Sequence, residues 1–225
     1  MRVWITRTQP SAQQSAKAFE AQGFEAVVAP LLTIGHIKPP LPNFDDNDVF
    51  IFTSKNGVRA YCNRVQTRSQ QVIAVGDKTA EFARSQGFQT VSSAAGNSDD
   101  VLELILAKGK KSKNYHHISG EVVRGDIHER LREAGYNASR HVLYKTAPSK
   151  LPRGFDIVDI DVIVFHSPLA AKCFTQRFPN ESNIATLSIS EATALVLNTQ
   201  TNLIAKAPTE TSMLSALIAY RDNRG

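Results

Sequence analysis

The chain has 225 residues, of which 42% are hydrophobic and 21% are charged. This is enough for one large α/β domain or two modest ones, and the composition excludes a disordered or fibrous protein. The formal net charge of +5 favours an anionic partner, but it does not distinguish a nucleic acid from a phosphate metabolite or a polycarboxylate.

Hydrophobic patterning predicts strands and helices in strict alternation along the whole chain. Such alternation indicates parallel sheets covered by helices on both faces. The first half predicts strands near 3–6, 49–53, 71–75 and 90–91, followed in turn by helices near 11–22, 56–65, 79–86 and 99–108. The second half predicts strands near 116–119, 162–165, 184–189 and 203–204, followed by helices near 123–134, 169–178, 192–199 and 212–221.

The two halves are copies of one pattern. Asp48–Ser54 returns as Asp161–Ser167 at an offset of 113 residues, and Ala74–Ala80 returns as Ser188–Ala194 at 114. Similar phrases in the same order at a nearly constant offset indicate an internal duplication.

Two proline-rich breaks lie at equivalent places of the copies, in Pro39–Pro42 and Ala147–Pro152. If both mark crossings between domains, the domains are residues 1–37 plus 147–225, and residues 38–146, joined by two strands. A single division near residue 112 is the alternative.

Basic residues are concentrated between residues 108 and 150, with ten Lys and Arg against four Asp and Glu. The densest part, Lys108–Lys113, predicts a solvated loop at a helix C-terminus, where cations suit the helix dipole. We therefore expect no nucleic-acid partner.

Other classes of site lack their usual signals. Cys62 and Cys173 are far apart in apolar helical contexts and predict reduced, buried thiols. The histidines show no metal-ligand spacing, and there is no Gly-rich phosphate loop, GxGxxG, HExxH or paired CxxC. No apolar run approaches the roughly 20 residues of a membrane span, and Met1–Arg7 alternates like a strand rather than a signal peptide. We expect a cytoplasmic protein without a membrane partner.

Hydroxyl and small side chains dominate the predicted carboxyl ends of the strands, where parallel sheets place their ligands. Such groups suit oxygen-rich anions, although helix capping alone is an alternative role for each Ser and Thr. Tyr144 lies at the predicted return crossing, where it would face the gap between domains. A phenol there can donate a hydrogen bond to a leaving group, and packing with a wetted hydroxyl is the alternative.

Over almost its whole length the chain resembles the uroporphyrinogen-III synthase family. The resemblance rests on Ile5-Thr6-Arg7, Phe52–Val58, Ala74-Val75-Gly76, Tyr144-Lys145-Thr146, Phe165–Pro168, Ile189-Ser190 and Ala207-Pro208. It implies two α/β domains joined by a two-stranded connection, with the first domain built from both ends of the chain. The implied reaction is the cyclisation of hydroxymethylbilane, a linear polycarboxylate, with loss of water and inversion of the last pyrrole ring, ring D. No metal or organic cofactor is implied.

The family pattern also assigns residues. It implies that Tyr144 assists the departure of hydroxide and that substrate contacts come from Thr53, Ser54, Thr79, Ser119, Gly120, Ser167 and Thr193, with Arg7, Arg124 and Lys145 as carboxylate partners. Two departures touch these assignments: Thr8 and Gln9 separate Arg7 from a proline that usually follows directly, and His166 replaces a more usual Thr.

We also expect a monomer that takes its substrate in a transient handover from hydroxymethylbilane synthase. The rival interpretation is a non-catalytic two-domain sensor of an anionic metabolite, because duplicated α/β domains with a hinge suit binding equally well.

Overall fold

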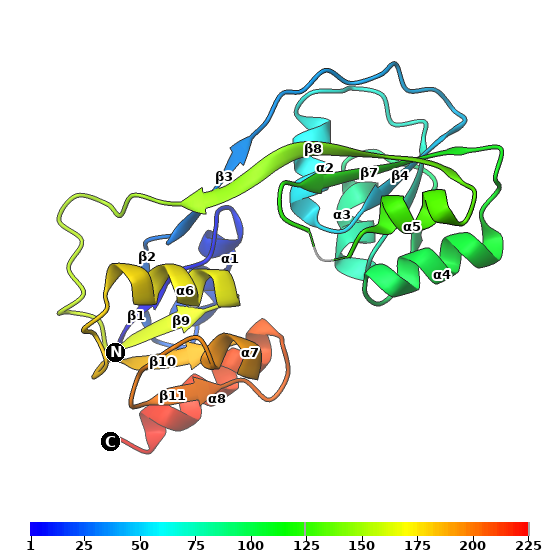
Figure 1. The fold of residues 1–225 in the computed structure, drawn as a ribbon. Helices are drawn as coiled ribbons and strands as arrows, with labels where there is room; N and C mark the ends of the chain where they lie inside the picture. Colours follow the sequence, from blue (N-terminus) through cyan, green and yellow to red (C-terminus); the bar gives the residue numbers. More distant parts are fainter. Residues whose placement is uncertain (124, 225) are drawn as a thin grey trace. The chain divides into compact units, whose positions relative to one another are not determined.

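The computed structural model describes residues 1–123 and 125–224 (Figure 1). Arg124, one of the expected carboxylate partners, lies outside the described residues. The chain divides into two compact units, Met1–Thr33 with Ala147–Gly225, and Ile34–Thr146. We call them unit 1 and unit 2 and describe each by itself.

Unit 1 contains a five-stranded sheet in the order β11-β10-β9-β1-β2, and all of its strand pairs are parallel. Both ends of the chain contribute to it. The strands are β1 (Arg2–Ile5), β2 (Glu25–Val28), β9 (Val162–Phe165), β10 (Ala185–Ser188) and β11 (Asn202–Ile204), and the helices are α1 (Ser11–Glu20), α6 (Pro168–Arg177), α7 (Glu191–Ala194) and α8 (Glu210–Asp222).

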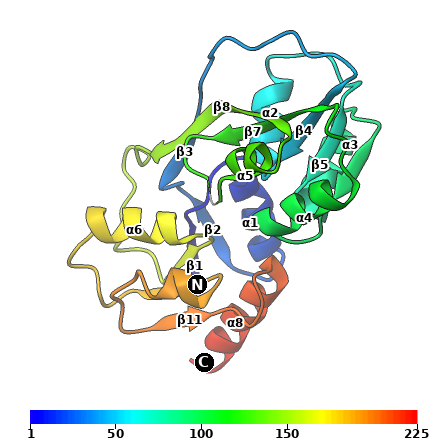
Figure 2. The same cartoon turned by 45° about the vertical axis from the view of Figure 1, so that its right-hand side comes forward.

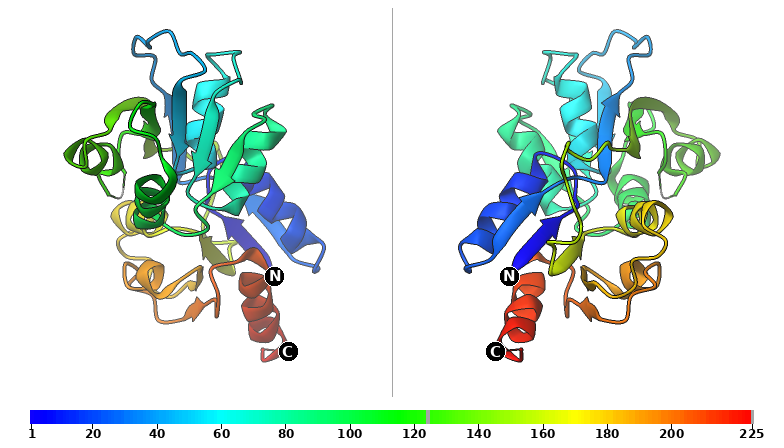
Figure 3. Two further views of the ribbon diagram at one scale, coloured as in Figure 1. Left: turned by 90° about the vertical axis from the view of Figure 1, so that its right-hand side faces the viewer. Right: turned by 90° about the vertical axis from the view of Figure 1, so that its left-hand side faces the viewer.

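The sheet of unit 1 buries both faces because its strands are apolar at successive positions. Val3 and Ile5 point to one face and join a core with α1 and α8, whereas Trp4 between them points to the other and packs with α6. Figure 3 shows α1 and α8 on one side of these strands and α6 on the other.

Unit 2 is built on a six-stranded sheet in the order β3-β8-β7-β4-β5-β6. Pairing is parallel from β8 through β7, β4 and β5 to β6. The strands are β3 (Leu32–His36), β4 (Asp48–Phe52), β5 (Gln71–Ala74), β6 (Val91–Ser93), β7 (Asn114–Gly120) and β8 (Asn137–Pro148), and the helices are α2 (Lys55–Cys62), α3 (Asp77–Ser85), α4 (Ser98–Lys108) and α5 (Ile127–Glu133).

Two cores again cover the sheet of unit 2. Val49 and Ile51 face α4 and α5, and Phe50 and Phe52 face α2 and α3. Figure 2 shows α4 beside α5, in agreement with their direct packing. The predicted fold class, two parallel α/β sheets, is confirmed, and β3 and β8 are the two strands that run through the boundaries between the units.

The units combine the two sequence copies crosswise. The β4-β5-β6 part of unit 2 corresponds to β9-β10-β11 of unit 1, and β7 corresponds to β1, each shifted by about the 113-residue offset of the sequence. The strand orders match when β11-β10-β9-β1-β2 is laid over β6-β5-β4-β7-β8. Each unit therefore joins the start of one copy to the remainder of the other.

Some predicted elements differ from the structure. The helix predicted near 123–134 begins only at Ile127, after Gly125, whose φ of +78° a right-handed helix excludes. The helix predicted near 192–199 ends at Ala194. The segment beyond it returns to the sheet, where the Thr199 and Thr186 hydroxyls are 2.9 Å apart.

Candidate active site

Three neighbouring strands of unit 2 bring candidate residues to one edge of the sheet. The register pairs Phe52 of β4 with Ile118 of β7, and Gly120 of β7 with Tyr144 of β8. Because the pairs are parallel, the carboxyl ends of β4 and β7 share this edge with Tyr144. We call Thr53, Ser54, Ser119, Gly120 and Tyr144 the carboxyl-edge cluster.

The centre of this cluster is a hydrogen bond between two hydroxyls. Ser54 Oγ lies 2.8 Å from the Tyr144 hydroxyl, and Ser54 also caps α2 by accepting the Gly57 N–H at 3.3 Å. A serine hydroxyl has one proton and two acceptor lone pairs. When Ser54 gives that proton to the Tyr144 oxygen, the phenolic proton is free for donation to a ligand.

Glycine at position 120 is required by the Tyr144 ring. A Cβ at Gly120 would lie 2.7 Å from Cε2 and 2.8 Å from Cζ of that ring. Gly57 in the first turn of α2 is constrained similarly, because a Cβ there would lie 2.7 Å from the Ile118 carbonyl oxygen. The two glycines allow β7 to approach both α2 and the tyrosine.

Arg140 of β8 supports the end of β7, a role that the sequence analysis missed. Its Nε donates to Ser119 Oγ at 2.9 Å, and its Nη2 donates to the carbonyl oxygens of Gly120 and Glu121, both at 2.7 Å. Ser119 is itself fully buried. Ser119 and Gly120 therefore help to position Tyr144. Arg140 contacts the hydroxyl of Ser119, and the Tyr144 ring lies against Gly120.

Thr53 contacts a buried histidine. Its hydroxyl lies 3.3 Å from Nε2 of His117, which is 1% exposed. Burial lowers the pKa of His117 to about 4, and the charges of Arg140 and His128 act in the same direction. The imidazole is therefore neutral at neutral pH and adds no charge beside Thr53.

Among the described residues, the side chains of Thr79 and Lys145 form no hydrogen bond or ion pair with the carboxyl-edge cluster. Thr79 lies in the first turn of α3, beside a hollow of about 350 Å³ that Gly76–Thr79 line with Ala95 and Gly96. Lys145 follows Tyr144 in β8, and successive strand residues point to opposite faces. Its exposed side chain passes next to Gly35 of β3.

The corresponding edge of unit 1 holds a charged network. Glu210, at the start of α8, accepts from Arg7 Nη1 at 3.0 Å, and its Oε2 also lies 3.1 Å from His166 Nε2. Arg7 donates to Ser15 as well, at 3.0 Å. Burial raises the pKa of the Glu210 carboxyl, but hydrogen bonding to His166 and the charges of His166 and Arg7 outweigh it and leave the pKa lowered. Arg7 thus has a carboxylate partner within the protein.

Ser167 and Thr193 lie at neighbouring strand ends of unit 1. Ser167 caps α6 by accepting the Ala170 N–H at 3.2 Å. Thr193 is fully buried, with its hydroxyl 3.2 Å from that of Ser190. Beside it lies a hollow of about 580 Å³ lined by Ile189–Ala192 and Ile204–Pro208, at the place equivalent to the hollow next to Thr79. Both copies of the pattern thus present a hollow at this strand end.

Sequence reasoning missed Arg140, His117 and Glu210 as members of these networks. An acidic residue in the first turn of a helix usually interacts with the helix dipole. The sequence therefore indicates this common role for Glu210, but it does not indicate which side chains contact the carboxylate. Within residues 1–123 and 125–224, no three or more His, Cys, Asp or Glu side chains gather where they could hold a metal ion. None of the helices described there has the length and apolar character that a membrane span requires. Cys62 and Cys173 are free thiols.

Comparison with known proteins gives a consistent result. The family model for uroporphyrinogen-III synthase HemD matches residues 13–215. A Methanocaldococcus jannaschii protein provisionally named uroporphyrinogen-III synthase is 32% identical over 87 residues, which span 36% of this chain and 36% of that relative.

Two solved structures share the fold. The uroporphyrinogen-III synthetase of Helicobacter pylori superposes with a TM-score of 0.71 at 20% identity, covering 98% of this chain and 99% of that chain. A mutant uroporphyrinogen III synthase of the extremely thermophilic bacterium Thermus thermophilus gives 0.58 at 17% identity, with 99% of both chains covered. The family model reaches across both units and both sequence copies, and the chain therefore belongs to the uroporphyrinogen-III synthase family.

Proposed function

We propose that this chain cyclises hydroxymethylbilane with loss of water and inversion of ring D, forming uroporphyrinogen III in tetrapyrrole (haem and sirohaem) biosynthesis. In class it is then a cyclising hydro-lyase. The observation that carries this proposal is the family match over residues 13–215, which includes the carboxyl-edge cluster. The hydroxyl-rich strand ends of both units support it.

The first step breaks the bond between the hydroxymethyl carbon and its oxygen. Tyr144 donates a proton to the departing hydroxide, which leaves as water, and the electrons of the pyrrole nitrogen form an azafulvene. The substituted α-carbon of ring D attacks the former hydroxymethyl carbon to give a spiro intermediate. The bond from that α-carbon to the bridge carbon of ring C then breaks, and the bridge carbon bonds to the unsubstituted α-carbon of ring D. Loss of the proton from this last carbon restores the pyrrole of the inverted macrocycle and balances the proton that Tyr144 donated. The 2.8 Å contact with Ser54 supports this assignment, because it orients the phenol.

Most of the catalysis in this proposal is positioning. The pyrroles supply their own reactivity, so the protein folds the chain and holds ring D in the attacking geometry. Thr53, Ser54, Thr79, Ser167 and Thr193 contribute hydroxyls or the first turns of helices to the substrate carboxylates. Ser119 and Gly120 act through the position of Tyr144, and Arg7 and Lys145 supply positive charge.

We also propose that the enzyme works as a monomer in the cytoplasm and receives its substrate directly from hydroxymethylbilane synthase. Its two free thiols suit a reducing compartment. The domains that act in the reaction are those expected above, residues 1–37 plus 147–225 and residues 38–146.

The test is consumption of freshly generated hydroxymethylbilane as a function of protein concentration. We expect a saturable rate proportional to enzyme and well above spontaneous closure. A chain that binds the bilane but leaves its rate of disappearance unchanged would contradict the proposal.

A further inference from the structure

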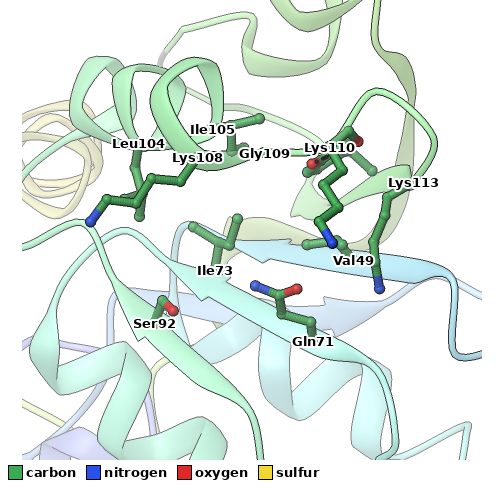
Figure 4. Close-up of a pocket in the computed structure, with 11 residues that line it drawn as sticks. Val49, Gln71, Ile73, Ser92, Leu104, Ile105, Lys108, Gly109, Lys110 and Lys113 are labelled. Atoms are coloured by element: carbon green, nitrogen blue, oxygen red, sulfur yellow. Dashed lines mark hydrogen bonds between the residues drawn. The ribbon is translucent and has the colours of Figure 1, made fainter.

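Unit 2 has a second pocket at the opposite edge of its sheet from the carboxyl-edge cluster. Val49 lies near the start of β4, Gln71 begins β5 and Tyr115 lies near the start of β7. Because these strands are parallel, their starts share one edge. The pocket has a volume of about 440 Å³, within the range of small-molecule sites (Figure 4).

The base of this pocket is apolar. Val49, Ile73 and Ile105 line it, and they are 1%, 5% and 0% exposed. Tyr115 belongs to the same core cluster, and the half-buried Leu104 of α4 completes the wall. Side chains from three strands, β4, β5 and β7, and from α4 therefore form the apolar part of the pocket.

The rim of the pocket is positively charged. Lys108, Lys110 and Lys113 line it, and no carboxylate is among its lining residues. Figure 4 shows Lys110 and Lys113 reaching from the loop after α4 towards Gln71, with Lys108 on the other side of the pocket. Lys113 Nζ lies 3.3 Å from the Asp46 carbonyl oxygen, and within the described residues neither Lys108 nor Lys110 has an ion-pair partner.

The loop that carries these lysines is held in place by specific contacts. The Tyr115 hydroxyl donates to the Lys110 carbonyl oxygen at 3.2 Å, and Asn47 Nδ2 donates to the Ser112 carbonyl oxygen at 3.0 Å. A Cβ at Gly109 would lie 2.6 Å from the Tyr115 hydroxyl. The sequence predicts a solvated loop that only neutralises a helix end, whereas the structure fixes this loop over an apolar hollow.

We propose that this pocket binds a planar organic polycarboxylate. Its carboxylates would pair with Lys108, Lys110 and Lys113, and its flat apolar body would lie on Val49 and Ile73. A single compact phosphate suits the site less well, because it would leave the apolar base of the pocket without a partner. The inference is independent of the proposed cyclisation, since it concerns the other edge of the sheet.

The experiment is calorimetric titration of the full chain with benzene-1,3,5-tricarboxylate. We expect one binding event per chain that weakens with added salt. The double variant Lys110→Gln/Lys113→Gln should bind at least tenfold more weakly. Lys111→Gln is the matched control, because Lys111 lies in the same loop but outside the pocket, with Nζ 5.5 Å from the Tyr136 ring centroid. It should change affinity less than twofold.

A second variant tests whether binding requires the pocket itself or only the positive charge of the surface. Ser92→Phe places a ring in the pocket without changing its charge, and it should also weaken binding at least tenfold. Citrate is the ligand control: it lacks a flat body and should bind poorly to every form of the protein. Equal weakening by Lys111→Gln, or no titration at millimolar ligand, would overturn the proposal. If Ser92→Phe fails to fold by circular dichroism, Leu104→Gln, on the half-buried wall, takes its place with the same expected loss.

Discussion

Two residues of the carboxyl-edge cluster hold Tyr144 in place. Gly120 leaves room for the ring, and Ser54 bonds the hydroxyl while it caps α2. The phenol can therefore act only in one orientation, which is what a proton donor to a departing hydroxide needs.

Removing the Tyr144 hydroxyl tests this role. Tyr144→Phe should lower kcat about 100-fold, in the range of general acid catalysis, with little change in KM. Tyr136→Phe is the control, because it loses one buried hydrogen bond, to the Ile105 carbonyl oxygen, away from the cluster. If folded Tyr144→Phe turned over at the wild-type rate, the acid role would be wrong.

The buried histidines predict a loss of stability in mild acid. The pKa values of His117 and His141 are both lowered to about 4 by burial, whereas an unfolded chain titrates near 6.5. The unfolded state therefore binds more protons between these values, so stability falls as the pH drops from about 6.5 towards 4.

For His117 the full effect is about 3 kcal/mol. Urea unfolding at pH 7 and pH 5 should show His117→Gln with a smaller pH dependence than wild type. An unchanged dependence in this variant would show that His117 is not the source.

Residues that end strands and begin helices could be predicted from local sequence, which is why Thr53, Ser54 and Ser167 were expected. Tyr144 lies within β8 and was expected from its place at the predicted return crossing. Local sequence could not predict the roles of Arg140, His117 and Glu210. Each of them contacts its partner across neighbouring strands or from a helix that is distant in the sequence. Arg140 meets Ser119 only through the register of β7 and β8. Such contacts depend on the order of the strands in the sheet, and the alternation of strands and helices in the sequence does not determine that order.

Among the secondary-structure elements, α2 is capped by Ser54, the residue that also contacts Tyr144 in the candidate site. Ser54→Ala removes the cap of α2 and the contact with Tyr144, and Asn97→Ala removes the capping box of α4. Each should cost about 1 kcal/mol of unfolding free energy.

Only Ser54→Ala should also lower turnover, by roughly tenfold. Denaturant midpoints measured beside initial rates separate the two effects. Equal activity in both capping variants would mean that Ser54 only caps its helix.

Strand and helix alternation predicted most elements of both copies, because apolar runs flanked by capping residues are local signals. It missed β2 (Glu25–Val28), which lies at the edge of its sheet and is only partly buried. It also extended α7 too far, because the contact between Thr199 and Thr186 that redirects the chain is long-range.

The whole molecule consists of two units that exchange the first β-α-β part of their sequence copies. Unit 2 is continuous in sequence and contains two complete core clusters. Unit 1 brings its two pieces together at the boundary, where the Ser149 N–H donates to the Leu31 carbonyl oxygen at 2.9 Å.

Residues 34–146 should therefore fold alone with one cooperative transition. Circular dichroism and urea titration of that fragment provide the measurement. A non-cooperative or unfolded fragment would show that the core of unit 2 depends on unit 1.

Ring inversion determines which isomer of the product is formed. Purified protein is given freshly generated hydroxymethylbilane, the products are oxidised, and the type I and type III isomers are resolved by chromatography. We expect the type III isomer in proportion to enzyme. Type I alone, formed at the spontaneous rate, would contradict it.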